Sequence, residues 1–394
     1  LGDVYKRQMY YLTDGLGAKP GCKTVGRVLA ALFACFCILA SFGIGNMSQV
    51  NSIVGSLNDA IDAFIPAAEG ERKLLNFIFG LVIAGLIGVI LFGGIKRIGA
   101  VAEKLVPVMS ILYIIFVFVV IFGHAGNIGP AFAKIFRTAF TPKALGGAAS
   151  GIALKQTIVW GLRRSAFSNE AGLGSAVMVN SASNVKEPVH QGMWGVFEIF
   201  ADTIVVCTIT ALVILTTGVV DLESGAVLAG VQDNALVGQA FTAAFGSFGP
   251  KFIAVSILLF AYSTTLGWSH YGTKAVEYLF GQKGTRVYKV IFVGMVVVGA
   301  TMKLGLAWDL SDTFNGLMMI PNLLAVLALS GTVVQITKNY LDRKVNGKDI
   351  PPMWSVFAEY QKAEEAEAAE EAKQAREAEA LAELEILGGH AVNE

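Results

Sequence analysis

Apolar runs long enough to cross a lipid bilayer recur along the first 335 residues of the chain. A hydrocarbon core of about 30 Å takes roughly 20 apolar residues as a helix. The runs of that length cover residues 25–50, 74–95, 105–123, 148–165, 195–217, 251–276, 286–304 and 307–335. The fourth run is the weakest, because Lys155, Gln156 and several glycines interrupt it. The pattern predicts an all-α membrane protein with about eight transmembrane helices in one domain over residues 9–335.

Positive side chains gather in loops that lie on one side of the bilayer if all eight runs cross it. In membrane proteins the short loops on the cytoplasmic side are enriched in Lys and Arg. The clusters are Lys19, Lys23 and Arg27; Lys96, Arg97 and Lys104; Arg163, Arg164 and Lys186; Lys274, Lys283, Arg286 and Lys289; and Lys338, Arg343, Lys344 and Lys348. We therefore expect the chain in the cytoplasmic (inner) membrane, with both of its ends in the cytoplasm.

Two connections between the runs have the pattern of surface helices. Residues 128–143 place four large apolar side chains at helical spacing, with Lys134 and Arg137 between them. This pattern predicts a short amphipathic helix at the outer surface. Residues 226–246 follow a similar pattern, and a gating element is the alternative for both segments.

The composition agrees with a membrane protein. Of the 394 residues, 54% are hydrophobic and 15% are charged, whereas soluble domains carry roughly 25% charged residues. The Ala/Glu-rich residues 358–394 hold 11 of the 30 acidic side chains and 3 of the 30 basic ones, which leaves a net charge of +8 on the rest. We expect residues 336–394 to form a cytoplasmic helical tail. A cytosolic enzyme, a secreted disulfide scaffold and a nucleic-acid binder are excluded.

The first eight residues fit no part of this pattern. The string LGDVYKRQ begins with Leu and has no apolar core of a signal peptide. It is similar to a translated sequencing adapter. We therefore expect residues 1–8 to be an artefact and the natural protein to begin further upstream.

Polar and small residues cluster at four places within the apolar runs, where such residues mark either helix packing or a substrate path. Asn46 and Gln49 share one helix face, and either an interhelical hydrogen bond or a site role is open to them. Residues 160–175 are bracketed by glycines and predict an interrupted helix. An interrupted helix exposes backbone N–H and C=O groups that can bind a carboxylate and a cation.

The other two clusters lie further along the chain. Residues 260–268 place three consecutive hydroxyls in the middle of the sixth run. These hydroxyls can bind Na⁺, although bonding back to a carbonyl one turn earlier is common in membrane helices. Residues 312–322 contain Pro321, which frees a backbone carbonyl near two asparagines.

The sequence has no motif of a known enzyme class. HExxH and GxSxG motifs are missing, and the four histidines are scattered. Glu198 and Asp202 stand one helical turn apart, but a metal pair needs further ligands. A packing or proton-related role, or a hydrogen bond to Thr203 or a neighbouring helix, is favoured. We expect no cofactor and no catalytic residue.

Several segments together resemble the alanine or glycine:cation symporter family, which are sodium-coupled amino-acid carriers with the leucine-transporter (LeuT) fold. In chain order the segments are MYYLTDGLG (9–17), GNMSQVNSI (45–53), FGGIKRIGAVAEKLVPVMS (92–110), GLRRSAFSNEAGLGSA (161–176), EPVHQG (187–192), FADTIVVCTITALVIL (200–215), FAYSTTLGWSHYGTKAVEYLFG (260–281) and FNGLMMIPNLLAVLALS (314–330). The resemblance runs from Met9 to about Ser330.

The resemblance implies a LeuT-type core of ten helices in two inverted repeats of five, with the first and sixth helices interrupted at the binding site. Residues 148–175 would be the sixth helix. Three runs precede it, and the family's GxGN and GGPGA segments do not occur upstream of residues 9–17. The resemblance therefore implies an N-terminally truncated chain that lacks the first two core helices. We expect such a fragment to be inactive by itself.

The resemblance also implies sodium-coupled symport of a small neutral amino acid, alanine or glycine. Gln49 would hydrogen-bond the substrate, and Trp268 would close the pocket and limit the size of the substrate. The implied residues are Gln49, Phe167, Asn169 and Trp268 for the substrate, and Ser263, Thr264 and the carbonyl of Phe260 for the coupling ion Na⁺.

Two alternatives remain open at this stage. A LeuT-fold carrier of another small solute, such as a nucleobase or a polyamine, would need a cationic or bulkier site. A membrane-embedded enzyme would need a nucleophile and a base at one depth, and the sequence offers no such pair. The expected partners are the amino acid, Na⁺ and the lipid bilayer.

Overall fold

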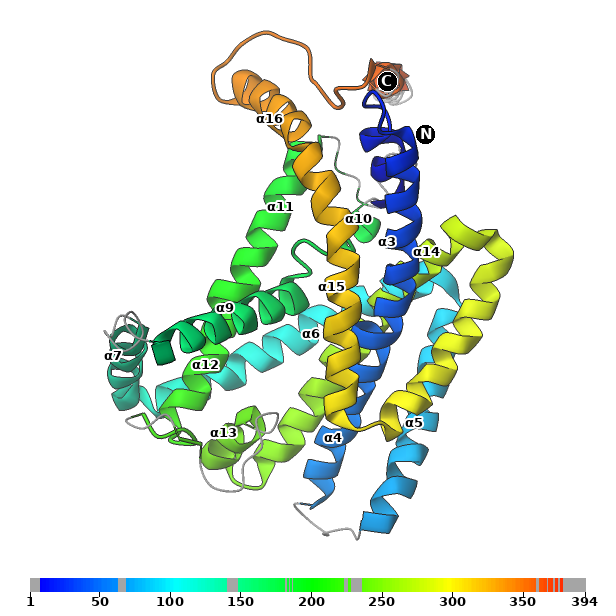
Figure 1. Cartoon of the computed structure of the whole chain (residues 1–394). Helices are drawn as coiled ribbons and strands as arrows, with labels where there is room; N and C mark the ends of the chain where they lie inside the picture. Colours follow the sequence, from blue (N-terminus) through cyan, green and yellow to red (C-terminus); the bar gives the residue numbers. More distant parts are fainter. Residues whose placement is uncertain are drawn as a thin grey trace, which may run out of the picture.

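The computed structural model describes residues 8–62, 69–139, 148–180, 187–222 and 236–358, with isolated residues between these ranges and short stretches of the tail. The described part is helical apart from turns and one isolated bridge between Val220 and Val227. The elements are α2 (Gln8–Tyr10), η1 (Tyr11–Leu16), α3 (Lys23–Phe42), η2 (Gly43–Met47), α4 (Ser48–Asp62), α5 (Glu69–Leu91), α6 (Gly94–Gly123), η3 (Ala125–Asn127), α7 (Ile128–Ala139), α9 (Ala148–Asn169), α10 (Ala176–Asn180), α11 (Pro188–Phe200), η4 (Ala201–Val206), α12 (Cys207–Thr216), α13 (Leu236–Phe245), α14 (Phe248–Thr301), α15 (Leu304–Ala328) and α16 (Ser330–Lys344). Figure 1 shows their arrangement.

Six helical segments of the described part are long and apolar enough to cross a membrane. They cover Lys23–Asp62, Gly70–Leu91, Lys96–Gly123, Pro188–Thr216, Phe248–Thr301 and Leu304–Ala328. The expected eight runs become six for two reasons. The sixth and seventh runs merge into the single helix α14. Helix α9 is not apolar enough to count as a membrane span, in keeping with its Lys155 and Gln156.

The 54-residue α14 is two helices joined at a sharp bend. Gly281 has a φ of 69°, which a helix does not accommodate. The chain turns back there (Figure 1), so that Tyr288 lies against Gly272, where a Cβ atom would meet its hydroxyl at 2.0 Å. A straight helix of this length would span about 80 Å at 1.5 Å per residue. Because the chain doubles back, the two parts before and after Gly281 can each cross the membrane once.

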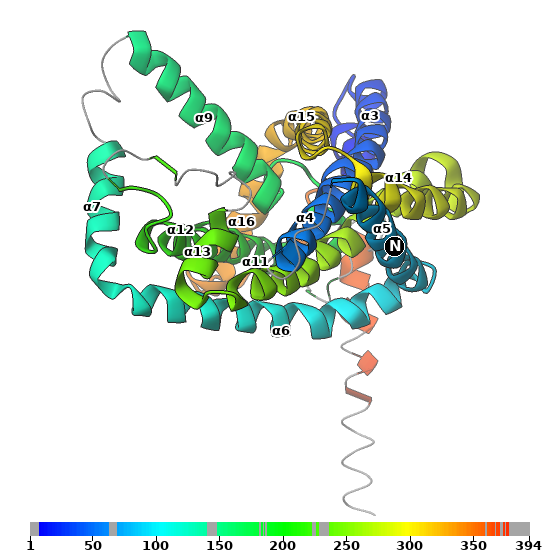
Figure 2. The same cartoon turned by 90° about the horizontal axis from the view of Figure 1, so that it is seen from below.

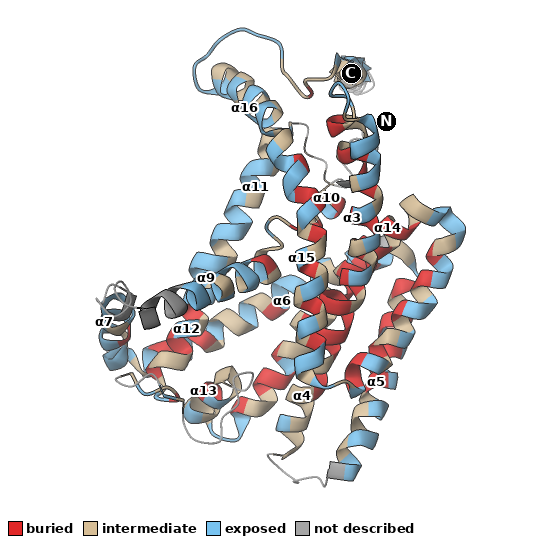
Figure 3. Cartoon of the chain, viewed as in Figure 1, coloured by how far each residue is buried: buried red, intermediate tan, exposed pale blue. Residues whose placement is uncertain are grey.

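The most buried side chains lie where α3, η2 and α4 pack against α14 and α15 (Figure 3). Phe33, Ile44 and Trp268 are each at most 2% exposed in this region. A second cluster joins α4, α5 and the start of α6 to both halves of α14, and a third joins α6 and α7 to α12, α13 and the start of α14. In Figure 2, α6 and α9 lie on opposite sides of α12 and α13. Helices α9 and α11 carry many exposed apolar side chains, which is typical of a surface that faces lipid.

The first span contains a short π-helix, η2, where an ordinary α-helix was predicted. Glycines in η2 allow two other helices to approach closely. A Cβ atom on Gly45 would lie 2.2 Å from Cβ of Trp268 on α14, and one on Gly43 would lie 3.2 Å from Cα of Ser311 on α15. Small residues permit this kind of close contact between membrane helices. The η2 segment therefore fixes the spacing of α14 and α15 around the first span.

The two predicted surface helices are found in part. The expected helix over residues 128–143 is confirmed as α7, which ends at Ala139, and residues 140–143 lie outside the described residues. Helix α13 occupies the second half of residues 226–246. Most of the first half of that segment also lies outside the described residues.

Candidate functional site

The predicted helix interruption lies between α9 and α10, over residues 170–175. Glu170, Gly172 and Gly174 have positive φ angles of 54°, 81° and 82°. The interruption predicted within residues 160–175 is therefore confirmed, and it begins nine residues after Gly161, which stays inside α9. We call residues 170–175 the break loop. Because its backbone leaves the helical path, its N–H and C=O groups are free to bond to other partners.

Two neighbouring elements hold the break loop. The Asn322 side chain on α15 donates an N–H to the carbonyl of Gly172 at 2.7 Å. The hydroxyl of Tyr11 in η1 in turn donates to the amide oxygen of Asn322. Pro321 lies inside α15, and because proline has no N–H, the carbonyl one turn earlier lacks its helical donor, as expected. The side-chain amide of Asn322 in the same region binds the loop.

Trp268 and Glu170 meet beside the break loop. Trp268 is 2% exposed and its ring lies edge-to-face with Tyr271, with ring centroids 5.2 Å apart. The hydroxyl of Ser175 donates a hydrogen bond to the Glu170 carboxylate, and the indole N–H of Trp268 and the hydroxyl of Tyr271 lie beside this carboxylate. Sequence reasoning did not single out Glu170. The available signal was a carboxylate in a glycine-rich interruption of an apolar run.

The residues expected to bind Na⁺ lie on one turn of α14. The hydroxyls of Ser263 and Thr264 both donate to the carbonyl of Phe260, at 2.8 and 3.0 Å. All three residues are half-buried. The structure thus brings these three oxygens together within one helical turn, in the back-bonded arrangement that is common for Ser and Thr in membrane helices.

Gln49 lies at the start of α4, just after the π-helix η2. Ser41 packs against Gly272 and Gly45 packs against Trp268, so α14 runs antiparallel to the first span there. The Gln49 amide donates to the carbonyl of Ile44 at 3.0 Å.

Asn46 contacts the part of α14 that follows the bend at Gly281. Its amide donates to the carbonyl of Phe292 at 2.7 Å, which confirms the interhelical hydrogen bond that the sequence left open.

Phe167 and Asn169 lie at the end of α9 and contact different helices. The Phe167 ring packs on Trp308 of α15, with ring centroids 4.7 Å apart. The Asn169 amide donates to the hydroxyl of Thr203 in η4 at 2.8 Å. Asp202 in η4 also bonds to the end of α9, because its carboxylate accepts a hydrogen bond from the hydroxyl of Ser168 at 2.6 Å. Among the described residues, no cluster of three or more His, Cys, Asp or Glu side chains could hold a metal ion.

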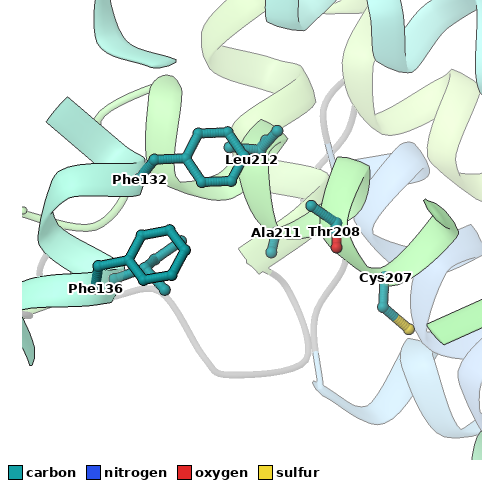
Figure 4. A pocket seen from close by; sticks show the side chains of 7 residues that line it. Phe132, Phe136, Cys207, Thr208, Ala211 and Leu212 are labelled. Carbon is teal, nitrogen blue, oxygen red and sulfur yellow. The ribbon is translucent and has the colours of Figure 1, made fainter. Parts of the chain in front are cut away.

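A cavity of about 290 Å³ lies away from these residues, between α7 and α12 (Figure 4). Its lining is almost wholly apolar and includes Phe132, Phe136 and Leu212. The cavity contains none of the predicted substrate or sodium residues. It therefore does not form part of the candidate site.

A family model described as the sodium:alanine symporter family matches residues 4–353. The chain belongs to this family. It is 39% identical to the sodium/alanine symporter AgcS of Methanococcus maripaludis over 347 aligned residues. The aligned region covers 88% of this chain and 71% of that relative. It is 36% identical over 342 residues to the probable sodium/glutamine symporter GlnT of Bacillus subtilis, covering 86% and 65%. It is 31% identical over 313 residues to the sodium/proton-dependent alanine carrier protein of a Bacillus species (strain PS3), covering 76% and 67%.

As a member of the sodium:alanine symporter family, the chain is a multi-pass membrane transporter for sodium-coupled amino-acid symport and is not an enzyme. Na⁺ is the coupling ion of this family. The break loop, Trp268 and the α14 hydroxyls are therefore the features that we consider for the substrate and the ion.

Proposed function

We propose that the natural protein carries alanine or glycine together with Na⁺ into the cell. The observation that supports this choice is the position of Trp268, whose indole lies against Gly45 beside the break loop. A buried aromatic ring that closes on a backbone leaves room for a small side chain only. The name of GlnT shows that the family includes a relative assigned to glutamine, so substrate size is the property to be tested.

The proposed substrate site uses Gln49, Phe167, Asn169 and Trp268. A zwitterion needs one positive and one negative pole. Asn322 already occupies the carbonyl of Gly172, and the N–H of Leu173 bonds to the carbonyl of Glu170, so in this proposal the other backbone groups of the break loop supply the two poles. Gln49 on α4 adds a donor and an acceptor. In this proposal the Gln49 amide leaves the carbonyl of Ile44 when the substrate binds.

The proposed sodium site uses the carbonyl of Phe260 and the hydroxyls of Ser263 and Thr264. Oxygen is the ligand that hard cations prefer. Each hydroxyl donates its proton to Phe260 and keeps oxygen lone pairs free for Na⁺. Further oxygen ligands would come from other segments.

The proposed architecture is the LeuT-type arrangement of two inverted five-helix repeats. The interrupted α9–α10 segment supports it, followed by α11–α12, the two halves of α14, and α15. These five elements would form the second repeat. We also propose that the ends of this chain face the cytoplasm of a cell bounded by its inner membrane. The start of α3 and α16 lie at the same end of the structure (Figure 1), in keeping with this orientation.

Uptake into proteoliposomes tests the proposal. The natural gene product that contains this chain is expected to take up alanine only with a Na⁺ gradient, with leucine and glutamine competing poorly. Replacing both Ser263 and Thr264 by Ala should raise the Na⁺ concentration for half-maximal uptake at least about tenfold, since each lost hydrogen-bonding ligand costs about 1–3 kcal/mol. Thr273→Ala is the matched control, because Thr273 makes the same back-bond on the same helix at Ser269.

Unchanged sodium dependence in the double variant would contradict the sodium site. Efficient competition by glutamine would contradict the size limit. Whether the 394-residue chain binds alanine by itself stays a prediction: isothermal titration with and without Na⁺ is expected to show no saturable binding.

A further inference from the structure

Glu170 has an unfavourable backbone conformation. Its φ of 54° is the one positive φ of a non-glycine residue in the described part of the chain. This left-handed region disfavours residues with a Cβ atom, and Asn and Asp tolerate it better than Glu. Such a conformation persists where the surroundings impose it, and it is frequent at functional sites. The side chain of Glu170 therefore needs a reason to be where it is.

Three buried donors converge on the Glu170 carboxylate. Ser175, Trp268 and Tyr271 are 0%, 2% and 9% exposed; Ser175 donates a hydrogen bond to this side chain, and the donor groups of Trp268 and Tyr271 lie beside it. A carboxylate is an acceptor with about four lone-pair positions and can serve all three donors at once. An amide oxygen at the same distance from the backbone can still accept from the indole, whereas a shorter carboxylate ends nearer the backbone. The reach of the acceptor thus matters at this position.

The Trp268 ring is held on several sides. Its Cβ lies against Gly45, its ring makes a T-shaped contact with Tyr271 at 77°, and its N–H lies beside Glu170. A buried indole N–H normally requires a partner. Glu170 is the carboxylate placed to serve as that partner.

We propose that Glu170 is a positioning residue that holds the Trp268 indole over Gly45 and thereby sets the size limit for the substrate. The inference deepens the proposed function and rests on it for the substrate. Because Glu170 belongs to the break loop, it links the interruption of α9–α10 directly to the ring on α14. A movement of the loop would then reorient Trp268.

Two variants separate the reach of the side chain from its charge. Glu170→Asp keeps the charge and suits the left-handed backbone, but it withdraws the carboxylate from the indole. Glu170→Gln keeps the length and one acceptor oxygen, but it removes the charge. If positioning is the role, Glu170→Asp should lower the leucine concentration that halves alanine uptake about tenfold. Glu170→Gln should stay within about twofold of the natural protein, and both variants should keep its sodium dependence.

A second measurement follows the indole itself. The natural gene product is labelled with 5-fluorotryptophan, and the ¹⁹F resonance of Trp268 is assigned with Trp268→Phe. Glu170→Asp should shift or broaden this resonance more than Glu170→Gln does, while the other tryptophans stay unchanged. Glu103→Ala, which removes an exposed carboxylate on α6, is the matched control and should change neither measurement.

The outcomes are distinct. An unchanged Trp268 resonance in Glu170→Asp overturns the proposal, whatever the uptake shows. A larger effect of Glu170→Gln than of Glu170→Asp, or a shifted sodium dependence, would make the charge the important property and also overturns it. If the natural protein takes up no alanine, the proposed function fails, and the fluorine measurement still decides whether Glu170 positions Trp268.

Discussion

Arg164 and Asp312 join α9 to α15, although 148 residues separate them in the sequence. One terminal nitrogen of Arg164 donates to both carboxylate oxygens of Asp312, at 2.8 and 2.6 Å. The guanidinium also lies over three aromatic rings, with Trp308 the nearest at 4.6 Å from ring centroid to Cζ. The Nε atom of Arg164 has no hydrogen-bond partner, and the electron-rich faces of these rings stabilise it instead. This contact anchors the end of α9 just before the break loop.

The first prediction concerns this ion pair. Asp312→Asn leaves the Arg164 charge among aromatic rings without its partner. The side chains are 38% and 20% exposed, so we expect the free energy of unfolding to fall by about 1–2 kcal/mol, between the values for exposed and buried pairs. Chemical unfolding in detergent micelles measures this change. Asp309→Asn, an exposed carboxylate on the same helix, is the control, and equal effects of the two variants would contradict the anchoring role.

The second prediction concerns substrate size. Trp268→Ala should open the site so that leucine and methionine compete for alanine uptake about tenfold better, since a hydrophobic pocket discriminates by about 1–3 kcal/mol per methylene. The affinity for alanine should fall because contact area is lost. Competition assays in proteoliposomes measure both effects. Trp194→Ala, at a position 62% exposed on α11, should leave the competition profile unaltered. A profile of Trp268→Ala that matches the natural protein would show that Trp268 packs structurally.

The third prediction uses two glycines of the first span. Gly45→Ala should lower the free energy of unfolding by about 1–3 kcal/mol through overpacking, because the new methyl group would lie 2.2 Å from Trp268. Gly55→Ala on α4 meets nothing within 4 Å, so helix propensity should raise stability by up to about 1 kcal/mol. The comparison is made by unfolding in the same detergent. Destabilisation by both variants alike would mean that the contact with Trp268 is not the cause.

The fourth prediction concerns orientation. In a cysteine-free background, Lys348→Cys should react with a membrane-impermeant maleimide only after the cells are opened. Glu71→Cys, at the start of α5, should react in intact cells because this end of α5 lies opposite α16 (Figure 1). Labelling of both positions from the outside would contradict the proposed topology.

Much of the fold could be predicted from hydropathy alone. The solvent of a membrane protein dictates the length and polarity of each helix, so the spans follow from apolar runs such as residues 105–123. The number of separate helices was less secure. The sixth and seventh runs join in α14, where Gly281 makes the turn, and a run of apolar residues does not reveal such a bend.

The candidate site was predictable where the chemistry is local. Phe260, Ser263 and Thr264 lie within one helical turn, and the 3.6-residue period places them together in any α-helix. The interruption followed from glycines, yet the structure starts it at Glu170 rather than near Gly161. Glycine permits a departure from the helix without requiring it, and at Gly161 no neighbour approaches within 4 Å.

The sequence by itself determined that this chain is an all-helical membrane protein, where its apolar spans lie, and which helix is interrupted. Each of these depends on residues close together in the chain and on the solvent around them. Only the tertiary structure decided that Glu170 meets Trp268, that Arg164 meets Asp312, and that Asn322 holds Gly172. Membrane helices are all apolar outside, so their surfaces carry little information about which helices become neighbours. Small residues and buried polar groups select the partners, and they do so only when the helices are already packed together.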